Sequence, residues 1–273
     1  MTDMQQPSLQ VAHLVKQYAN ADRPVLNDIS FEVPHGKVFV IVGPSGSGKS
    51  TLLRTIAGLE PIQGGTISLN GEVIETGRPG TESAAGRSKR SSELRTRVGM
   101  VFQSYDLFPN KTVLGNITLA PTLVQKRDKA EVEEEAVALL ERVGLADRKD
   151  AWPHELSGGQ RQRVAICRAL ILHPEVLLFD EVTAALDPEM VREVLDVMLE
   201  LADRGQTMLI VTHEMQFARA IADQVILLED GGIVEQSDDA ERFFTHPQTE
   251  RAQQFLHTFE FDRHRTSGDA VDQ

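Results

Sequence analysis

Residues 43–50 constrain the fold of this chain more than any other stretch. They read GPSGSGKS and complete the pattern G-x-x-x-x-G-K-[ST]. An apolar run with strand character, residues 38–42, precedes them, and residues 51–57 follow with helical character as far as Gly58. In such a unit the glycines let backbone N–H groups converge on phosphate oxygens, and the helix adds the positive end of its dipole. The sequence therefore predicts a phosphate-binding loop at the end of a buried strand.

Lys49 and Ser50 supply the side-chain chemistry of this loop. An ammonium group makes charge-assisted hydrogen bonds of about 1.5–3 kcal/mol each to phosphate oxygens, and the Ser50 hydroxyl suits Mg²⁺. A glycine-rich turn without a ligand is the alternative, and the strand before it and the helix after it argue against that alternative. We expect the nucleotide contacts of this loop to come from Gly43, Pro44, Ser45, Gly46, Ser47, Gly48, Lys49, Ser50 and Thr51.

Two adjacent carboxylates follow a second apolar strand. Asp180 and Glu181 come directly after residues 176–179, which read VLLF. In parallel sheets, ligands bind at the carboxyl ends of the strands. Asp180 is expected to hold Mg²⁺ through water, and Glu181 to polarise the water that attacks the γ-phosphorus of a bound nucleotide. The alternative, a pair of acids that solvate a strand end, is weak beside a complete phosphate loop.

A second candidate anion site lies at residues 156–160, which read LSGGQ. Ser157 is expected to be the N-cap of an amphipathic helix over residues 161–172, and Gly158 and Gly159 leave backbone N–H donors free near Gln160. One chain has no evident need for two phosphate cradles. This cap is therefore expected to complete the nucleotide pocket of another copy, although an ordinary capped helix stays open on spacing alone.

The order of the other segments predicts an α/β fold. Short β-rich segments at residues 29–33, 38–42 and 66–69, followed by the hairpin turn Asn70-Gly71, indicate a small antiparallel sheet near the start. Further on, strands and helices alternate, which is typical of a parallel sheet covered by helices. The alternating segments are strands at 176–179, 207–211 and 224–228 and helices at 188–202 and 215–222.

Two stretches lie outside that alternation. Residues 128–143 have the apolar periodicity of an amphipathic helix, which Gly144 ends. Residues 77–92 are rich in Gly, Ser, Pro, Lys and Arg and indicate a surface insertion. A basic cluster at this insertion either contacts a partner or belongs to a solvated loop; it comprises Arg87, Lys89, Arg90, Arg95 and Arg97.

Composition excludes several classes of protein. The 28 Lys and Arg against 41 Asp and Glu give a net charge of −13, which disfavours binding to nucleic acid. The single cysteine, Cys167, forms no internal disulfide, so a reducing compartment fits best. The apolar runs are far shorter than the ~20 residues of a membrane span, and the start lacks the pattern of a signal peptide. We expect a chain that neither spans a membrane nor is exported.

Six motifs together resemble the ATP-binding subunit of an ABC transporter. They occur in family order within residues 9–258, and are residues 43–50, Gln103, residues 156–160, Asp180-Glu181, Ala185-Leu186-Asp187 and Thr212-His213. The resemblance implies that Tyr18 stacks on the adenine ring. It implies that Gln103 senses Mg²⁺ and the membrane partner. It also makes Asp187 a contact across a dimer and His213 a ligand of the γ-phosphate.

The resemblance further implies an architecture and a mechanism. The architecture is a RecA-like P-loop core with a mainly parallel sheet, an N-terminal antiparallel β subdomain and an inserted helical subdomain. Within a single domain over 1–260, residues 1–102 and 157–260 would form the core, 103–156 the helical part and 261–273 a polar tail. Two copies would clamp two ATP molecules, with Mg²⁺, at the cytoplasmic face of a bacterial inner membrane. Transmembrane permease subunits and an extracytoplasmic solute-binding protein would complete the system.

A narrower resemblance points to the cargo. Residues 103–109, 211–219 and 243–247, the last ahead of 253–256, are similar to those of ATPases for polar amino-acid uptake. Another transporter class, of the lipoprotein-release or cell-division type, is the first alternative, and a soluble ATPase of translation or DNA repair is the second. Val182 stands where the family usually has proline, and Ala184 where serine is common. Because valine keeps a backbone N–H and does not fix φ, this difference puts the positioning of Glu181 in doubt.

Overall fold

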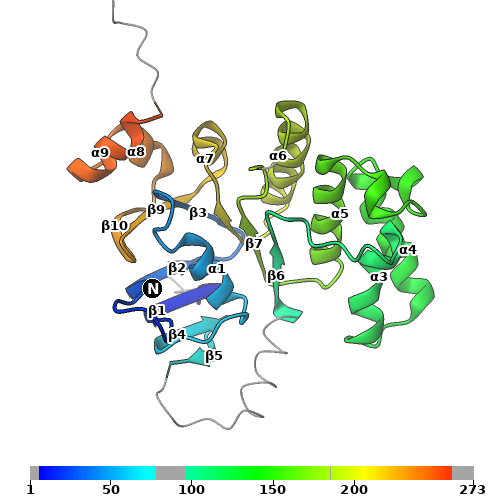
Figure 1. Ribbon diagram of the computed structural model, residues 1–273, viewed down its shortest axis with the longest axis horizontal. Helices are drawn as coiled ribbons and strands as arrows, with labels where there is room; N and C mark the ends of the chain where they lie inside the picture. The colour runs from blue at the N-terminus through cyan, green and yellow to red at the C-terminus, as the bar shows by residue number, and fades with distance from the viewer. Residues whose placement is uncertain (1–5, 78–95, 185, 260–273) are drawn as a thin grey trace, which may run out of the picture.

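The computed structural model describes residues 6–77, 96–184 and 186–259. The expected insertion, apart from Gly77, and the polar tail lie outside the described residues, as does Ala185. Of the basic cluster, Arg97 is described, and it forms ion pairs of 2.6 Å with both Glu72 and Glu175. The described strands make two sheets, one of four strands and one of six (Figure 1).

The six-stranded sheet has the order β10-β9-β3-β8-β7-β6. Its parallel strands are β6 (Val98–Val101), β7 (Val176–Asp180), β8 (Met208–Val211), β3 (Val38–Val42) and β9 (Gln224–Glu229), and β10 (Gly232–Ser237) pairs antiparallel to β9. The predicted parallel sheet is confirmed. Every residue of β3, β7 and β8 is buried, as expected for strands covered on both faces. The carboxyl ends of these three neighbours therefore meet at one edge of the sheet.

The four-stranded sheet is antiparallel and has the order β2-β1-β4-β5. It comprises β1 (Leu9–Lys16), β2 (Leu26–Val33), β4 (Gly64–Leu69) and β5 (Glu72–Thr76). The turn between β4 and β5 is the predicted hairpin, with Asn70 and Gly71 at φ 49° and 78°. The prediction that residues 38–42 belong to this sheet is wrong, since β3 pairs in parallel with β8 and β9.

Helices cover both faces of the six-stranded sheet. On one face α1 (Lys49–Ile56) and the four-stranded sheet share a core with Phe39 and Ile41 of β3. On the other face Val38, Val40 and Val42 pack in a second core. The helices of that second face include α6 (Pro188–Asp203), α7 (Met215–Ile221), α8 (Ala240–Thr245) and α9 (Glu250–His257). Figure 1 shows α1 below β3 and the helices α6 to α9 above it.

A helical lobe lies beyond the β6 edge of the sheet (Figure 1). It contains α3 (Val113–Leu123), α4 (Lys129–Arg142) and 3₁₀ turns at Ala146–Arg148 and Pro153–Glu155. Helix α5 (Gly158–Leu170) belongs to both parts, because its Val164 and Cys167 pack in the core of the lobe while Ala165 and Ile166 pack in the core under α6. Among the described helices, none is long and apolar enough to span a membrane.

Candidate nucleotide-binding site

The phosphate loop connects the buried end of β3 to the first turn of α1. Gly43 and Gly48 have positive φ angles of 152° and 102°. A Cβ atom would lie 2.0 Å from Leu228 O at Gly43 and 2.8 Å from Leu26 Cδ2 at Gly48, so only glycine fits at either position. The loop can therefore take the shape in which its N–H groups point to a common centre.

Lys49 lies folded across this loop. Its Nζ donates hydrogen bonds of 2.9 Å to the carbonyl oxygens of Gly43 and Pro44. Burial lowers the pKa of Lys49, and the negative charges of Glu181 and Asp180 oppose that shift. The two carboxylates predicted for the site thus favour the charged form of the ammonium group, while its burial opposes that form.

A cavity of about 270 Å³ opens over the loop. It is lined by Val25, Ser45, Gly46, Gly48, Lys49, Ser50, Thr51 and Glu181. All of these except Val25 are predicted site residues. Val25 immediately precedes β2. It reaches the loop only through the packing of the two sheets, so nothing in the local sequence around it indicates a ligand.

Ser50 and Asp180, two of the three residues expected at Mg²⁺, contact each other beside the phosphate loop. Ser50 Oγ donates a 2.7 Å hydrogen bond to Asp180 Oδ1. Burial raises the pKa of Asp180, while the Ser50 hydrogen bond lowers it. A hydroxyl and a carboxylate held together next to a phosphate loop are the oxygen donors that Mg²⁺ prefers. Gln103, the third predicted metal residue, lies exposed in the turn after β6 and does not line the cavity.

Glu181 and His213 approach each other from the ends of β7 and β8. His213 Nε2 lies 2.9 Å from Glu181 Oε1. Glu181 has a φ of 48°, which is unusual for a residue with a side chain. Its N–H donates to Val211 O at 3.0 Å, and its carbonyl oxygen accepts a 3.1 Å bond from the Ala184 N–H. The backbone thus holds this carboxylate at the mouth of the cavity.

Val182, the departure from the family pattern, packs inward from this turn. Its side chain is buried in the core cluster beneath α6. A proline at this position would restrict the turn by fixing its φ angle through the ring. With valine, apolar packing of the side chain holds the turn that carries Glu181.

A capping box formed by Ser157 and Gln160 closes the N-terminus of α5. Ser157 Oγ accepts a 3.2 Å bond from Gln160 N–H, and Gln160 Oε1 accepts a 3.0 Å bond from Ser157 N–H. A Cβ at Gly158 would lie 2.8 Å from Leu186 Cδ2, and one at Gly159 would lie 2.9 Å from Met190 Cβ. This cap therefore lies beside the start of α6, and none of its residues lines the cavity over the phosphate loop.

Asp187 and Tyr18 occupy the remaining predicted positions. Asp187 is the exposed N-cap residue of α6, yet its side chain makes no capping hydrogen bond. Tyr18 follows β1 and is 40% exposed. Burial and the Glu60 carboxylate raise the pKa of Tyr18, whereas a hydrogen bond from Thr51 lowers it. Tyr18 thus lies next to Thr51 at the edge of the cavity.

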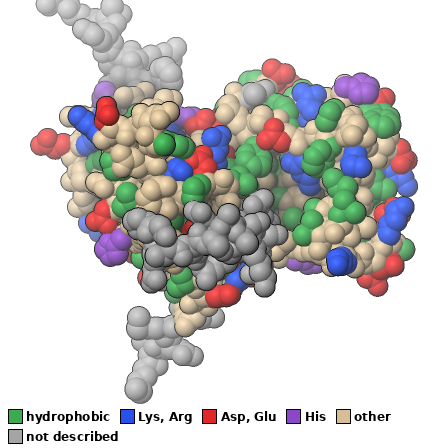
Figure 2. Space-filling view, turned by 60° about the horizontal axis from the view of Figure 1, so that its bottom comes forward, with side chains coloured by type: hydrophobic (Ala, Val, Ile, Leu, Met, Phe, Trp, Pro, Cys, Tyr) green, Lys and Arg blue, Asp and Glu red, His purple; other side chains and the backbone are tan. Residues whose placement is uncertain are grey.

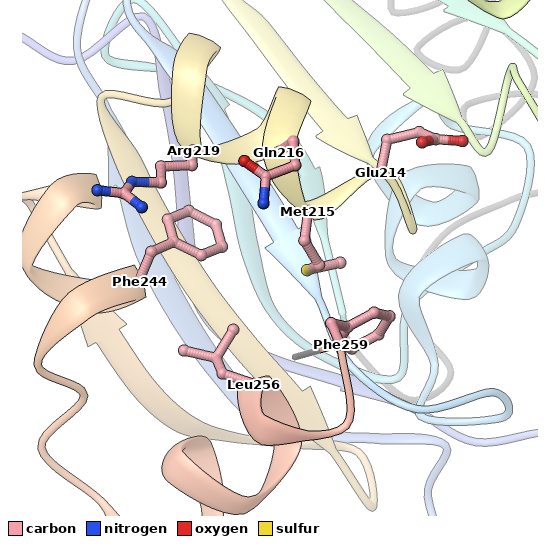
Figure 3. A pocket seen from close by; sticks show the side chains of 7 residues that line it. All are labelled: Glu214, Met215, Gln216, Arg219, Phe244, Leu256 and Phe259. Carbon is pink, nitrogen blue, oxygen red and sulfur yellow. The ribbon is translucent and has the colours of Figure 1, made fainter. Parts of the chain in front are cut away.

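Another cavity, of about 260 Å³, lies between α7, α8 and α9 (Figure 3). Its lining residues are Glu214, Met215, Gln216, Arg219, Phe244, Leu256 and Phe259. None of them is a predicted site residue. The cavity whose lining matches the predicted site residues is therefore the one over the phosphate loop.

Comparison with known proteins supports the same assignment. The family model described as "ABC transporter" matches residues 26–184. The glutamate transport ATP-binding protein GluA of Corynebacterium efficiens is 54% identical over 235 residues, covering 86% of this chain and 93% of that protein. The glutamate/aspartate import ATP-binding protein GltL of Escherichia coli K12 is 53% identical over 232 residues, covering 85% and 92%. The glutamine transport ATP-binding protein GlnQ of Bacillus subtilis is 49% identical over 235 residues, covering 86% and 93%.

A solved structure agrees with the fold. The protein cbiO1 of Clostridium perfringens, part of the ABC transporter complex cbiONQ, matches with a TM-score of 0.76 and 28% sequence identity, covering 94% of this chain and 100% of that chain. The residues that match the family model contain the phosphate loop, Gln103, the capped start of α5, and Asp180 with Glu181. The chain therefore belongs to the ABC transporter family, as an ATP-binding subunit with ATPase activity.

Proposed function

We propose that this protein drives the uptake of a polar amino acid, and that it works as a homodimer which binds two ATP molecules with Mg²⁺. The cargo class is supported by the relatives, whose names refer to glutamate, aspartate and glutamine at 49–54% identity. The same similarity favours uptake over a transporter of the lipoprotein-release or cell-division type and over a soluble ATPase.

The position of the α5 cap supports the homodimer. Ser157, Gly158 and Gly159 lie beside α6, away from the cavity of their own chain. The nearby Asp187 carboxylate is exposed and does not cap its helix. In a pair of copies facing each other, these groups would close the partner's cavity from the open side. ATP would then hold the two copies together, and hydrolysis would release them.

Hydrolysis in such a pair would follow from the residues around the cavity. Lys49 and the loop N–H groups bind the β- and γ-phosphates, and Glu181 accepts the proton of the attacking water. His213, next to Glu181, would hold the γ-phosphate. Ser50, Asp180 and Gln103 would hold Mg²⁺, which would supply positive charge at the phosphates when bound.

The helical lobe is the surface on which separate permease subunits would dock. Four large hydrophobic side chains of the lobe and of the segment leading to it are exposed, namely Phe108, Leu123, Val124 and Trp152. Figure 2 shows hydrophobic side chains scattered among charged ones over this half of the molecule. We place the protein at the cytoplasmic face of the inner membrane, with a solute-binding protein on the other side.

Mixing two inactive variants tests the homodimer. Lys49→Ala disables the phosphate loop and Ser157→Arg disables the cap. A mixed dimer then contains one site with an intact loop from one copy and an intact cap from the other. We expect ATPase activity to reappear on mixing, and wild-type activity per molecule to rise with protein concentration. Full activity of a strict monomer at every concentration, with no recovery on mixing, would overturn the homodimer.

Uptake tests the cargo. The protein is coexpressed with permease subunits and a solute-binding protein from the organism that makes it, in cells that lack their own glutamate, aspartate and glutamine uptake. We expect uptake of at least one of these amino acids in cells with the intact protein and not with Glu181→Gln. Uptake of none of the three would contradict the cargo class while leaving the ATPase assignment intact.

A further inference from the structure

Two side chains hold Tyr18: Lys16, two residues earlier, and Glu60, which follows α1. Its phenol donates a 2.5 Å hydrogen bond to Glu60 Oε2. Lys16 Nζ lies over the ring, 4.6 Å from its centroid. The same Glu60 oxygen lies 3.1 Å from Lys16 Nζ. Lys16, Tyr18 and Glu60 thus form a closed triangle of contacts, which we name the Tyr18 clamp.

Lys16 and Glu60, the two supports of the clamp, lie at or just beyond the ends of β1 and α1. Lys16 ends β1, its side chain is 4% exposed, and its Nζ also donates to Pro61 O at 2.9 Å. Glu60 follows the end of α1, where its N–H donates to Arg54 O. A buried ammonium group is costly unless it is paired, and here the carboxylate, the carbonyl and the ring satisfy it. Helix α1 begins at Lys49, at the end of the phosphate loop, and Glu60 follows its other end. The clamp therefore connects Tyr18 to the helix that starts at the phosphate loop.

The clamp determines which face of the Tyr18 ring is free. Lys16 covers one face, so a ligand can stack only on the other. Tyr18 nevertheless keeps 40% of its surface exposed, which leaves room for that ligand. A tyrosine on an exposed turn would otherwise lose side-chain freedom when a base stacks on it, and fixing the ring beforehand removes part of that cost.

We propose that Lys16 and Glu60 are positioning residues, which fix the Tyr18 ring with one face open to a purine base and so set the affinity for the base and not for the phosphates. This inference rests on the proposed function, since it takes the bound nucleotide to be ATP and, as the family resemblance implies, its adenine to stack on Tyr18. The competing explanation is that the clamp only fastens β1 to α1.

Two probes separate these explanations, because ATP carries the base and inorganic tripolyphosphate does not. In Lys16→Met and Glu60→Gln we expect the dissociation constant for ATP to rise about three- to tenfold, and KM to rise with it while kcat stays within twofold. The dissociation constant for tripolyphosphate should stay within twofold of the wild-type value. Lys37→Met is the matched control, because it removes a lysine that pairs with Asp223 before the amino end of β3, and it should change neither constant.

A double variant covers the case in which a single change destabilises the protein. Lys16→Met with Glu60→Gln leaves no buried charge unpaired, so stability should recover, whereas the loss of ATP affinity should persist. Equal weakening of ATP and tripolyphosphate in these variants, or unchanged ATP affinity, would overturn the inference.

Tyr18→Ala distinguishes that failure from a failure of the proposed function. If Tyr18→Ala weakens ATP binding while the two clamp variants do not, the clamp is wrong and adenine stacking stands. If Tyr18→Ala also leaves ATP binding unchanged, the stacking itself is wrong and the clamp inference falls with it.

Discussion

Ser50 Oγ donates a 2.7 Å hydrogen bond to Asp180 Oδ1, across 130 positions of sequence. Ser50 lies in the first turn of α1, and Asp180 is the last residue of β7. The hydroxyl after the phosphate loop and the acid at the strand end are therefore in direct contact. This contact makes Asp180 the residue through which metal dependence and stability can be tested separately.

Replacing Asp180 with asparagine should weaken the use of Mg²⁺. Asparagine can still accept the Ser50 hydrogen bond, so the local fold is kept, but the negative charge that attracts the cation is lost. We expect the free Mg²⁺ concentration for half-maximal ATPase activity to rise by about tenfold or more, as for other losses of a charged partner. Measuring ATPase rates over a series of free Mg²⁺ concentrations checks this, and an unchanged midpoint would remove Asp180 from the metal site.

The same substitution should stabilise the protein in the absence of nucleotide and Mg²⁺. Burial raises the pKa of Asp180, so the folded chain holds its proton more tightly than the unfolded chain. This group therefore favours folding only below its unfolded pKa, and its ionised form costs stability once the pH exceeds the raised folded value. Asp180→Asn should raise Tm at pH 7.5 by a few degrees, since ~1 kcal/mol corresponds to about 2–4 °C.

Differential scanning calorimetry at several pH values measures that gain. The difference from the wild type should shrink as the pH falls to about 4, near the usual range of a carboxyl group. Asp187→Asn, at an exposed carboxylate, is the control and should leave Tm unchanged. A lower Tm for Asp180→Asn at pH 7.5 would show that the ionised carboxylate stabilises the fold.

Glu181→Gln should separate ATP binding from hydrolysis. The amide keeps the size of the side chain but cannot accept a proton, so hydrolysis should fall by at least ~10²-fold. ATP binding should stay within a few-fold of the wild type, and light scattering should show a dimer that persists with ATP. Glu214→Gln, at an exposed carboxylate just after His213, should keep its rate within twofold. Normal turnover by Glu181→Gln would contradict its role.

Lys49→Ala should act on nucleotide binding itself. Lys49 would contribute charge-assisted hydrogen bonds of about 1.5–3 kcal/mol, so we expect a dissociation constant for ATP about ten- to hundredfold higher. Isothermal titration calorimetry measures this, with Lys37→Ala as the control. Equal affinity of Lys49→Ala and the wild type would remove this ammonium group from the phosphate site.

The parts of the fold that could be predicted from the sequence are those coded by contiguous residues. The phosphate loop, the apolar run of β7 and the cap at Ser157 each carry their own local pattern, and the structure has a loop, a buried strand and a capped helix there. The run 38–42 resembles a member of the antiparallel sheet because its neighbours in the sequence are antiparallel strands, but it pairs in parallel with β8 and β9. Its uninterrupted apolar character is typical of a parallel strand buried on both faces.

The rest depends on contacts between distant positions. The sequence pattern does not indicate strand β1, because the polar His13 breaks its alternation; in the structure its pairing with β2 has register shifts between residues 11 and 16. Strand β6 contains Gly99, where a larger residue would clash with Leu177 and Pro174. That need for glycine arises from packing against distant residues and cannot be seen in the local sequence. Glu60 meets Lys16 and Tyr18 across the junction of β1 and α1, and no spacing in the sequence indicates that encounter.

Cys167, the single cysteine, should be unreactive in the folded protein. It is fully buried in α5, its thiol donates a 3.6 Å hydrogen bond to Leu139 O, and burial raises its pKa to about 12. At pH 8 the thiolate fraction is then on the order of 10⁻⁴, and reagents have no path to it. We expect mass spectrometry to find no iodoacetamide adduct on the native protein after an hour and one adduct in guanidinium chloride. Stoichiometric labelling of protein that keeps its ATPase activity would show that the junction between α5 and the lobe opens readily.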